Sequence, residues 1–451
     1  MNRRRFLATA GAMTAAGLVP GLGSLAVRAA SAQASGDYKA LVCVFLYGGN
    51  DTNNTVVPMD DYAQYAAVRG GSSVGLGLGE LVPIKPASPG RAYGLHPGLA
   101  ALAPLFASGT MAVACNVGTL LAPLTRAQYR SGTGKAPRNL FSHSDQQLQW
   151  QGLVPNALAN TGWGGRMADL TAAGNSVLGI PGVLSVSGDA LFTIGQTSIP
   201  LALPGDGGNG LSGDYESDAG RIRYAALQKI LTVDREPILV AKAADVMDLA
   251  LRSAKAINDA VGTVPGAVQD AFSGNYTDLG AQLARVATLI AAKDVLGVNR
   301  HIFFCSMGGY DTHSSQRGEQ GDRLSELGPS LAAFQAAMDA LGLAPQVTAF
   351  TMSDFSRTFR VNANEGTDHA WGSHQFVLGG AVKGGTFYGT FPALVLDGPD
   401  DAGTEGQWIP TTSLDQFGAT LARWFGVPAA SLTQVFPNVT AFPSADLGFL
   451  G

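Results

Sequence analysis

Cysteine and charge are both scarce in this chain of 451 residues, which has three cysteines and only 14% charged residues. The three cysteines, Cys43, Cys115 and Cys305, lie inside apolar, strand-like runs, where a free cysteine usually behaves as a small buried hydrophobe. The sequence therefore implies neither a disulfide framework nor a cysteine metal site. The net charge is −5, and no Lys/Arg cluster follows the first few residues, so nucleic acid is not an expected partner.

Long apolar runs are absent beyond the N-terminal region, so no stable transmembrane span is expected after it. Residues 1–34 begin with three consecutive arginines, starting at Arg3. An apolar, Gly-rich segment follows and ends in the small-residue pattern Ala32-Gln33-Ala34. This segment resembles a signal peptide for the twin-arginine export machinery, which carries folded proteins. We therefore expect a periplasmic or extracellular protein. A retained membrane anchor is the alternative, which the interrupting glycines and Pro20 disfavour.

The remaining chain, residues 35–451, is long enough for one large α/β domain with an insertion, which we prefer, or for two domains. Short apolar runs alternate with segments that have apolar residues at helical spacing. The runs cover residues 40–47, 111–117, 301–307 and 347–352, and the helix-like segments cover 97–106, 278–296, 322–341 and 414–425. This alternation predicts a layered α/β/α fold with a mostly parallel central sheet.

An inserted region is predicted over about residues 174–296. It begins with short β-type runs broken by Gly, Pro and Ser, continues through a Gly/Asp-rich link, and becomes helical from Arg221. The helical part either covers the site as a cap or packs beside the sheet, and the sequence leaves both arrangements open.

Three of the predicted strands are followed by ligand-type residues: Asp51 after the first, Asp311 and His313 after the third, and Asp354 after the fourth. Ligands of open α/β sheets bind beyond the carboxyl ends of the strands, so these side chains are expected at one edge. Each has a structural alternative: an Asx-rich turn at Asp51, a histidine hydrogen-bonded to a nearby aspartate at His313, and a helix cap at Asp354.

Asp368, His369 and His374 add ligand-type side chains in one Gly-rich stretch and are harder to explain structurally. Imidazole and carboxylate together are the ligands that borderline divalent metals accept. We therefore expect one or two divalent ions, with zinc, manganese and calcium as the options.

Other polar residues are candidates for substrate chemistry. Ser142 and Ser144 precede a probable helix and are candidate nucleophiles, although Ser144-Asp145 is also an ordinary helix N-cap, which is the preferred interpretation. Arg357 and Lys383 are candidates for binding the oxyanions of a substrate, or else pair with nearby aspartates. His96 and His301 are expected to be structural.

Several segments taken together strongly resemble the secreted bacterial family called domain of unknown function 1501, across nearly the whole mature chain. They are 46–51, 139–147, 309–313, 353–358 and 367–380, with the export signal. That family is similar to the alkaline phosphatase and sulfatase superfamily, whose members place two divalent metals at strand ends beside a hydroxyl or formylglycine nucleophile.

This resemblance implies metal roles for Asp51, Asp311, His313 and Asp354, with His369 or His374 as the final histidine, and places Ser142 or Ser144 in the region of the nucleophile. The chain departs from the superfamily pattern where Asp311-x-His313 replaces Asp-x-x-x-His and where Asp354-Phe355 replaces Asp-His. It also lacks the Cys-x-Pro-x-Arg sulfatase signature, so formylglycine chemistry is unsupported.

The expected function is a secreted, metal-dependent hydrolase of phosphate or sulfate esters, with a small-molecule or polymer ester as substrate. The alternative is a non-catalytic periplasmic or envelope-binding protein that keeps the fold and a degenerate or structural metal site. An open coordination position beside a hydroxyl or water would favour the enzyme, whereas a site closed by protein ligands would favour the alternative.

Overall fold

The computed structural model describes residues 38–154, 159–175, 180–203, 217–262 and 264–451. A nine-stranded sheet forms its centre, in the order β11-β5-β10-β9-β1-β8-β6-β7, with β12 paired to β5. The export signal predicted over residues 1–34 lies outside the described residues.

The four predicted strands are present and form the middle of this sheet. They are β1 (Lys39–Leu46), β5 (Met111–Gly118), β8 (Arg300–Met307) and β9 (Val347–Ser353). β1 lies between β8 and β9 and is parallel to both, whereas β10 (Ser373–Leu378) is antiparallel to β5 and β9. The shorter strands are β6 (Val183–Ser185), β7 (Leu201–Ala202), β11 (Phe387–Tyr388) and β12 (Thr412–Ser413). The prediction of a mostly parallel sheet is confirmed.

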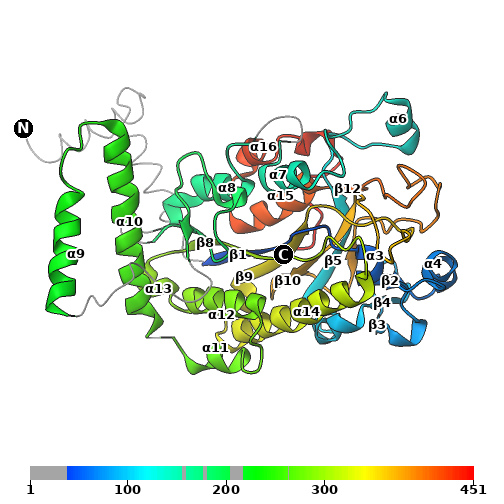
Figure 1. The fold of residues 1–451 in the computed structure, drawn as a ribbon, viewed down its shortest axis with the longest axis horizontal. Coiled ribbons are helices and arrows are strands. Elements are labelled where there is room, and N and C mark those ends of the chain that lie inside the picture. Colours follow the sequence, from blue (N-terminus) through cyan, green and yellow to red (C-terminus); the bar gives the residue numbers. More distant parts are fainter. Residues whose placement is uncertain (1–37, 155–158, 176–179, 204–216, 263) are drawn as a thin grey trace, which may run out of the picture.

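Helices cover both faces of the sheet, as Figure 1 shows. α12 (Asp278–Ala291) and α14 (Gln316–Ala340) lie on one face, and α7 (His143–Gly152), α8 (Trp163–Thr171), α15 (Leu414–Phe425) and α16 (Leu432–Val435) lie on the other. The sheet has one hydrophobic core on each face, and alternate residues of β1 belong to each. Val42 and Val44 lie in the core on the side of α12 and α14, and Leu41 and Cys43 lie in the core on the opposite side. A strand buried on both faces needs apolar residues at every position, which is why this strand is a continuous apolar run.

The region predicted as an insertion adds β6 and β7 to one edge of the sheet. β6 pairs with β8, and α12 packs on β8 and α14. α9 (Asp218–Ile230) and α10 (Ile238–Val261) stand at the left end of Figure 1, whereas α3 (Thr52–Thr55), which directly follows β1, lies toward the right. The ligand-type residues follow the carboxyl ends of the strands, so these two helices are not a cap over them. The part of this region that the structure describes also contains α11 (Gly266–Ala271) and α13 (Lys293–Leu296).

The remaining elements lie around the sheet's margins. A small antiparallel sheet of β2 (Val56–Pro58), β4 (Tyr93–Leu95) and β3 (Val82–Ile84) follows α3 and accompanies α4 (Tyr62–Arg69). α5 (Ala103–Ala107) follows the 3-10 helix Pro97–Leu102, and α6 (Arg126–Ser131) lies near α7 in the sequence. None of the helices in the described part of the chain is both long and apolar enough to cross a membrane.

Candidate metal centre

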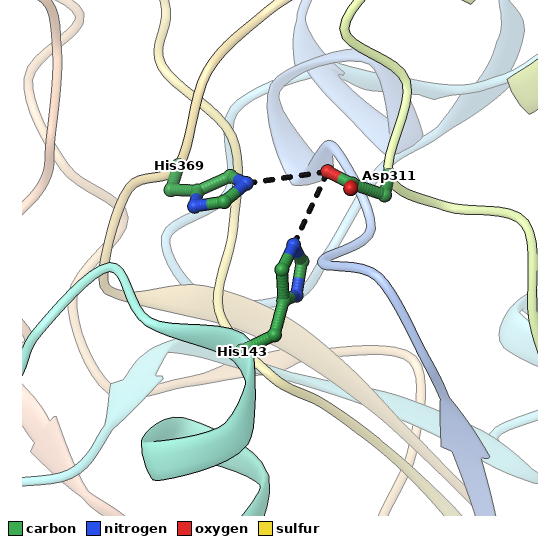
Figure 2. Close-up of side chains that lie close together, drawn as sticks. All are labelled: His143, Asp311 and His369. Atoms are coloured by element: carbon green, nitrogen blue, oxygen red, sulfur yellow. Dashed lines mark hydrogen bonds and ion pairs between the residues drawn. The ribbon is translucent and has the colours of Figure 1, made fainter.

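Three side chains from distant parts of the sequence form a group that could hold a metal ion: His143, Asp311 and His369. Their ligand atoms all lie within 4.8 Å of one another. Figure 2 shows the imidazoles of His143 and His369 pointing at one oxygen of Asp311. Nε2 of each ring is 3.2 Å from Asp311 Oδ1. This is the arrangement of imidazole nitrogen and carboxylate oxygen that borderline divalent metals accept.

His313 adds a third imidazole at the same point. Its Nε2 is 3.0 Å from Asp311 Oδ1 and 2.9 Å from Nε2 of His369. Three ring nitrogens therefore converge on a single carboxylate oxygen.

The opposite nitrogen of each ring faces an oxygen that accepts a hydrogen bond. Nδ1 of His143 lies 2.7 Å from Asp354 Oδ2, and Nδ1 of His313 lies 2.8 Å from Asp368 Oδ1. Nδ1 of His369 lies 2.6 Å from the carbonyl oxygen of Phe141. Carboxylate and carbonyl oxygens only accept, so in each neutral ring the proton is assigned to Nδ1 and the lone pair to Nε2.

That assignment tests whether a metal fits these residues. Arg357 donates to Asp311 Oδ1 at 2.6 Å, which offsets the charge of the carboxylate. The three Nε2 lone pairs still repel one another unless a cation or extra protons lie among them. Metal-bound histidines almost always donate their other ring N–H to a carboxylate or a backbone carbonyl, as all three do here. The residues therefore fit a divalent metal, and the predominance of imidazole favours zinc over calcium and manganese, which prefer oxygen ligands.

Charges around the group set its protonation. Although burial acts to raise the pKa of Asp311, the hydrogen bond and charge of Arg357 lower that pKa to about 2, which keeps the carboxylate ionised. The hydrogen bond to Asp354 raises the pKa of His143, and burial lowers the pKa of His369. The carboxylates that favour a proton on His143 also favour a metal cation at the same place.

The chain brings these residues together through the loops that end its parallel strands. Asp311 and His313 follow β8, and His369 lies in the loop between β9 and β10. Gly48 follows β1 with φ +112°, and a Cβ there would lie 2.4 Å from the backbone nitrogen of Asp311. This close approach requires glycine, since a larger residue would push the Asp311 loop away.

The predicted ligand Asp354 and the nearby Asp368 hold two of the histidines of the group. Asp354 is fully buried and accepts hydrogen bonds at Oδ2 from His143 and from Gln147 Nε2, at 2.8 Å, while its Oδ1 has no hydrogen-bond partner among the described residues. No helix follows Asp354, so it does not cap one. Asp368 holds His313 in the same way.

Asp51 lies outside the group. Its carboxylate caps α3 by accepting from the backbone N–H of Asn53 at 3.0 Å, and it also accepts from Arg69 at 2.6 Å and from Gln316. Asp51 is buried and both of its oxygens are occupied, which matches the Asx-turn alternative.

His374 also lies outside the group. Its Nδ1 accepts from the backbone N–H of Asn116 at 3.0 Å, and its ring stacks on Phe391. Burial lowers the pKa of His374 to about 3, so the ring is neutral at pH 7.

The two basic residues predicted to bind substrate lie in different places. Arg357 is fully buried and donates to Asp311 at 2.6 Å, to the carbonyl of Gly48 at 3.1 Å and to Thr367. Lys383 follows the far end of the antiparallel strand β10, where the neighbouring Gly384 bonds the carbonyl of Gly109, just before β5 begins. That is the amino edge of the parallel strands, so Lys383 lies at the edge opposite the metal group.

The two candidate nucleophiles flank His143 at the start of α7. Ser142 donates to Asp145 Oδ2 at 2.7 Å and lies 3.3 Å from the hydroxyl of Ser144. Ser142 occupies the N-cap position, but its side chain makes no capping hydrogen bond. The interpretation of this segment overlooked His143, which lies between the two serines. The available signal was a histidine at a predicted helix start, because histidine is the commonest metal ligand.

Comparison with known proteins gives distant structural similarities. A search of curated proteins finds no significant match. The crystal structure of PsFucS1 sulfatase from Pseudoalteromonas sp. is 8% identical, with a TM-score of 0.36, over 91% of this chain and 72% of that chain. The structure of Ps i-CgsB in complex with k-i-k-neocarrahexaose is 7% identical, with a TM-score of 0.30, over 90% of this chain and 76% of that chain. Similarities this distant assign neither an activity nor a substrate to this chain.

The family comparison is more specific. The model described as "Protein of unknown function (DUF1501)" matches residues 38–426, which include every residue of the metal group and the carboxylates that hold its histidines. The chain therefore belongs to the DUF1501 family.

Proposed function

We propose that this protein is an exported, metal-dependent hydrolase of phosphate or sulfate esters. The observation that carries the proposal is the convergence of three Nε2 atoms on Asp311 Oδ1, with each Nδ1 held by an oxygen acceptor. A divalent metal bound by these residues would supply a Lewis acid for the ester and would lower the pKa of a bound water or hydroxyl. The likeness to the alkaline phosphatase and sulfatase superfamily, inferred from the sequence, agrees with this chemistry.

Solvent access supports an enzymatic role over a purely structural site. The side chain of Asp311 is 46% exposed, and that of His313 is 43% exposed. A substrate can therefore reach the group from solvent, as a catalytic metal site with an open coordination position requires.

The start of α7 supports an anionic substrate. Its first backbone N–H groups have no intrahelical acceptor, and the side chain of Ser142 does not cap them. These N–H groups adjoin His143, so an oxyanion of the ester near the metal group would also meet the positive end of the helix dipole. Ser142 and Ser144 are adjacent and remain the candidate nucleophiles, with water as the other choice.

Arg357 serves a positioning role in this scheme. Its side chain is fully buried and donates to Asp311, to the carbonyl of Gly48 and to Thr367, so it fixes the Asp311 carboxylate. Asp354 and Asp368 orient His143 and His313, and the carbonyl of Phe141 orients His369. These contacts hold the ligands ready before a metal binds, which reduces the ordering cost of binding.

A second function has one specific observation in its favour. His313 provides a fourth donor beside His143, Asp311 and His369, and four protein ligands would close a tetrahedral site. The protein would then be a non-catalytic envelope protein with a structural metal.

Elemental analysis and hydrolysis assays on the same exported sample separate the two functions. The substrates would be aryl phosphate, aryl phosphodiester and aryl sulfate, each tested with and without a chelator. The proposal expects stoichiometric metal and turnover that the chelator abolishes and added metal restores. An Asp311→Ala variant should lose both metal and turnover, whereas Ser142→Ala or Ser144→Ala should lose turnover but keep metal if that hydroxyl is the nucleophile.

Metal without turnover on any of the three ester classes, together with a four-coordinate cobalt-substituted spectrum, would support the structural site. Absence of metal after zinc and manganese are offered would reject both functions.

A further inference from the structure

A buried glutamine joins the two loops that carry most of the metal group. Gln316 is the first residue of α14, and its side chain is fully buried. Its Oε1 accepts a hydrogen bond from the hydroxyl of Thr312 at 3.1 Å and another from the hydroxyl of Thr367. Thr312 lies in the loop after β8, and Thr367 lies in the loop between β9 and β10. One amide oxygen therefore binds both loops.

Both threonines are close in sequence to residues of the metal group. Thr312 stands between Asp311 and His313. Thr367 lies two residues before His369, and its backbone N–H donates to the carbonyl of Thr312 at 3.1 Å. Because each threonine shares a backbone with its neighbours, any movement of Thr312 away from Thr367 also separates Asp311 from His369.

Gln316 also reaches Asp311 through Arg357. Nε of Arg357 donates to Thr367 Oγ1 at 3.3 Å, and Nη1 of Arg357 donates to Asp311 Oδ1 at 2.6 Å. Since the Thr367 hydroxyl accepts from Arg357, its own hydrogen is directed at Gln316 Oε1. This chain of hydrogen bonds ends on the Asp311 oxygen at which the three Nε2 atoms converge.

The other end of the amide is anchored in a buried ion pair. Nε2 of Gln316 donates to Asp51 Oδ2, which also accepts from Arg69 at 2.6 Å. The side chains of Asp51 and Arg69 are both inaccessible to solvent. Breaking such a pair would leave uncompensated buried charges, so the pair is a fixed point for the amide.

These partners require a group that both donates and accepts. A carboxylate such as that of Asp51 only accepts, so the atom that faces it must donate. The two threonine hydroxyls donate, so the atom that faces them must accept. The primary amide of Gln316 does both in one plane, whereas a methionine of similar length would leave both sides unpaired.

We propose that Gln316 is a positioning residue for the metal, which sets the spacing between Asp311 on one loop and His369 on the other through Thr312 and Thr367. The inference rests on the proposed metal group, but it does not depend on the hydrolysis of any substrate. Ligands that are held at their final spacing before the metal arrives lose less conformational freedom when it binds.

The zinc affinity of the full exported protein tests this role, measured by competition with a chromophoric chelator. Gln316→Met should weaken zinc binding by about 10- to 100-fold, the usual effect of removing a partner that orients metal ligands. Gln335→Met is the matched control and should leave the affinity unchanged. Gln335 is also a buried glutamine of α14 and donates to Asp339 at 3.0 Å, but it lies about 28 Å further along the helix at 1.5 Å per residue.

Thr367 provides a second test that keeps the shape of the side chain. Thr367→Val removes only the hydroxyl and should weaken zinc binding by about 10-fold. Thr367→Ser restores the hydroxyl and should bind zinc as the wild type does. Because Gln316 and Thr367 act through one hydrogen bond, the double variant Gln316→Met, Thr367→Val should bind zinc no more weakly than Gln316→Met alone.

The visible spectrum of the cobalt(II)-substituted protein separates positioning from a purely structural role. The absorption bands report the geometry of the ligands, so they should shift in Gln316→Met and stay unchanged in Gln335→Met. A loss of stability alone would not move the bands of the folded protein. Circular dichroism checks folding, and if Gln316→Met does not fold, the valine and serine variants of Thr367 decide the question.

Equal zinc affinities in Gln316→Met and Gln335→Met would overturn this inference and leave the metal centre in place. The same holds if Thr367→Ser binds zinc as weakly as Thr367→Val. A wild type that binds neither zinc nor cobalt would instead overturn the proposed function, and the inference with it.

Discussion

The six histidines of this chain divide into two sets that lie in different regions and have opposite chemistry. At the carboxyl edge of the sheet, His143, His313 and His369 direct Nδ1 at oxygen acceptors and Nε2 at Asp311. The other three, His96, His301 and His374, are buried, and each is held at Nδ1 by a separate partner.

The partners of the second set explain the difference. His96 and His374 accept backbone N–H groups at Nδ1, which places the ring proton on Nε2, and His301 bonds the hydroxyl of Tyr38. Burial lowers the pKa of His96 to about 4 and the pKa values of His301 and His374 to about 3. Residue type alone therefore does not identify a metal ligand. The hydrogen-bond partner of Nδ1 decides whether Nε2 carries the proton or has a lone pair that can bind a metal.

The division of the histidines into two sets is tested most directly by substituting one histidine of each set. His369→Gln should reduce bound metal from near stoichiometric to a trace, because it removes one of the converging nitrogens. His374→Gln should leave the metal content unchanged, because His374 faces Asn116 and Phe391. Elemental analysis of both folded variants checks this, and equal losses of metal would return His374 to the ligand set.

The carboxylate behind His143 offers a finer test. Asp354→Asn should weaken metal binding by about 10- to 100-fold, the usual effect of changing a partner that orients a ligating histidine. The loss arises because an amide is a weaker acceptor than a carboxylate for Nδ1 of His143. Competition with a chromophoric chelator measures the change. Affinity equal to that of the wild type would show that Asp354 does not act through His143.

Substitution of two glycines tests whether the close approach of Gly48 to Asp311 stabilises the protein. Gly48→Ala should destabilise the protein by about 1–3 kcal/mol, because a strained backbone adds to the contact with Asp311. Gly109→Ala is the control: Gly109 also has positive φ, +80°, but a Cβ there meets nothing within 4 Å. Urea unfolding gives both values, and the excess loss in Gly48→Ala reports the close approach alone.

Acid should distinguish His301 from His143 by the sign of the effect on stability, because burial lowers the pKa of His301 and the hydrogen bond to Asp354 raises that of His143. The unfolded chain protonates His301 below about pH 6.5, and the folded chain does so only near pH 3. Between these values the unfolded state binds the extra proton, so stability that is complete above pH 6.5 falls as pH drops, at about 1.4 kcal/mol per pH unit for this ring.

His301→Gln should therefore flatten the pH dependence of unfolding between pH 7 and pH 5, as measured by denaturant titration. In metal-free protein, His143→Gln should steepen it, because the raised pKa of His143 favours the folded state when the ring is protonated. Equal slopes in the wild type and both variants would contradict the separation.

Much of the fold was predictable because a buried strand requires a run of apolar residues that is visible in the local sequence. β1, β5, β8 and β9 are buried on both faces, so each is an apolar run, and β1 and β9 lie within one residue of the predicted bounds. β10 was not predicted as a strand, because Ser373, His374 and Gln375 interrupt any apolar run, and no local pattern gives its antiparallel direction. That direction places Lys383 at the opposite edge from the metal group.

The site was predictable in part, for a related reason. Asp311, His313 and His369 follow strands or lie between them, and the general position of ligands at strand ends pointed to their loops. Asp51 satisfied the same rule, but Arg69 and Gln316 occupy its carboxylate. Contacts of this kind join residues that are distant in sequence, and no local pattern records them.

The sequence by itself determined that this is an α/β protein with histidine and aspartate residues after its strands, because apolar periodicity and residue type are local properties. Only the tertiary structure decided that His143 joins Asp311 and His369, that His374 stays apart, and that α9 and α10 lie away from the site. The hydrogen-bond partner of each histidine nitrogen and the direction of each strand decide these arrangements. Both depend on packing between residues that are far apart in the sequence.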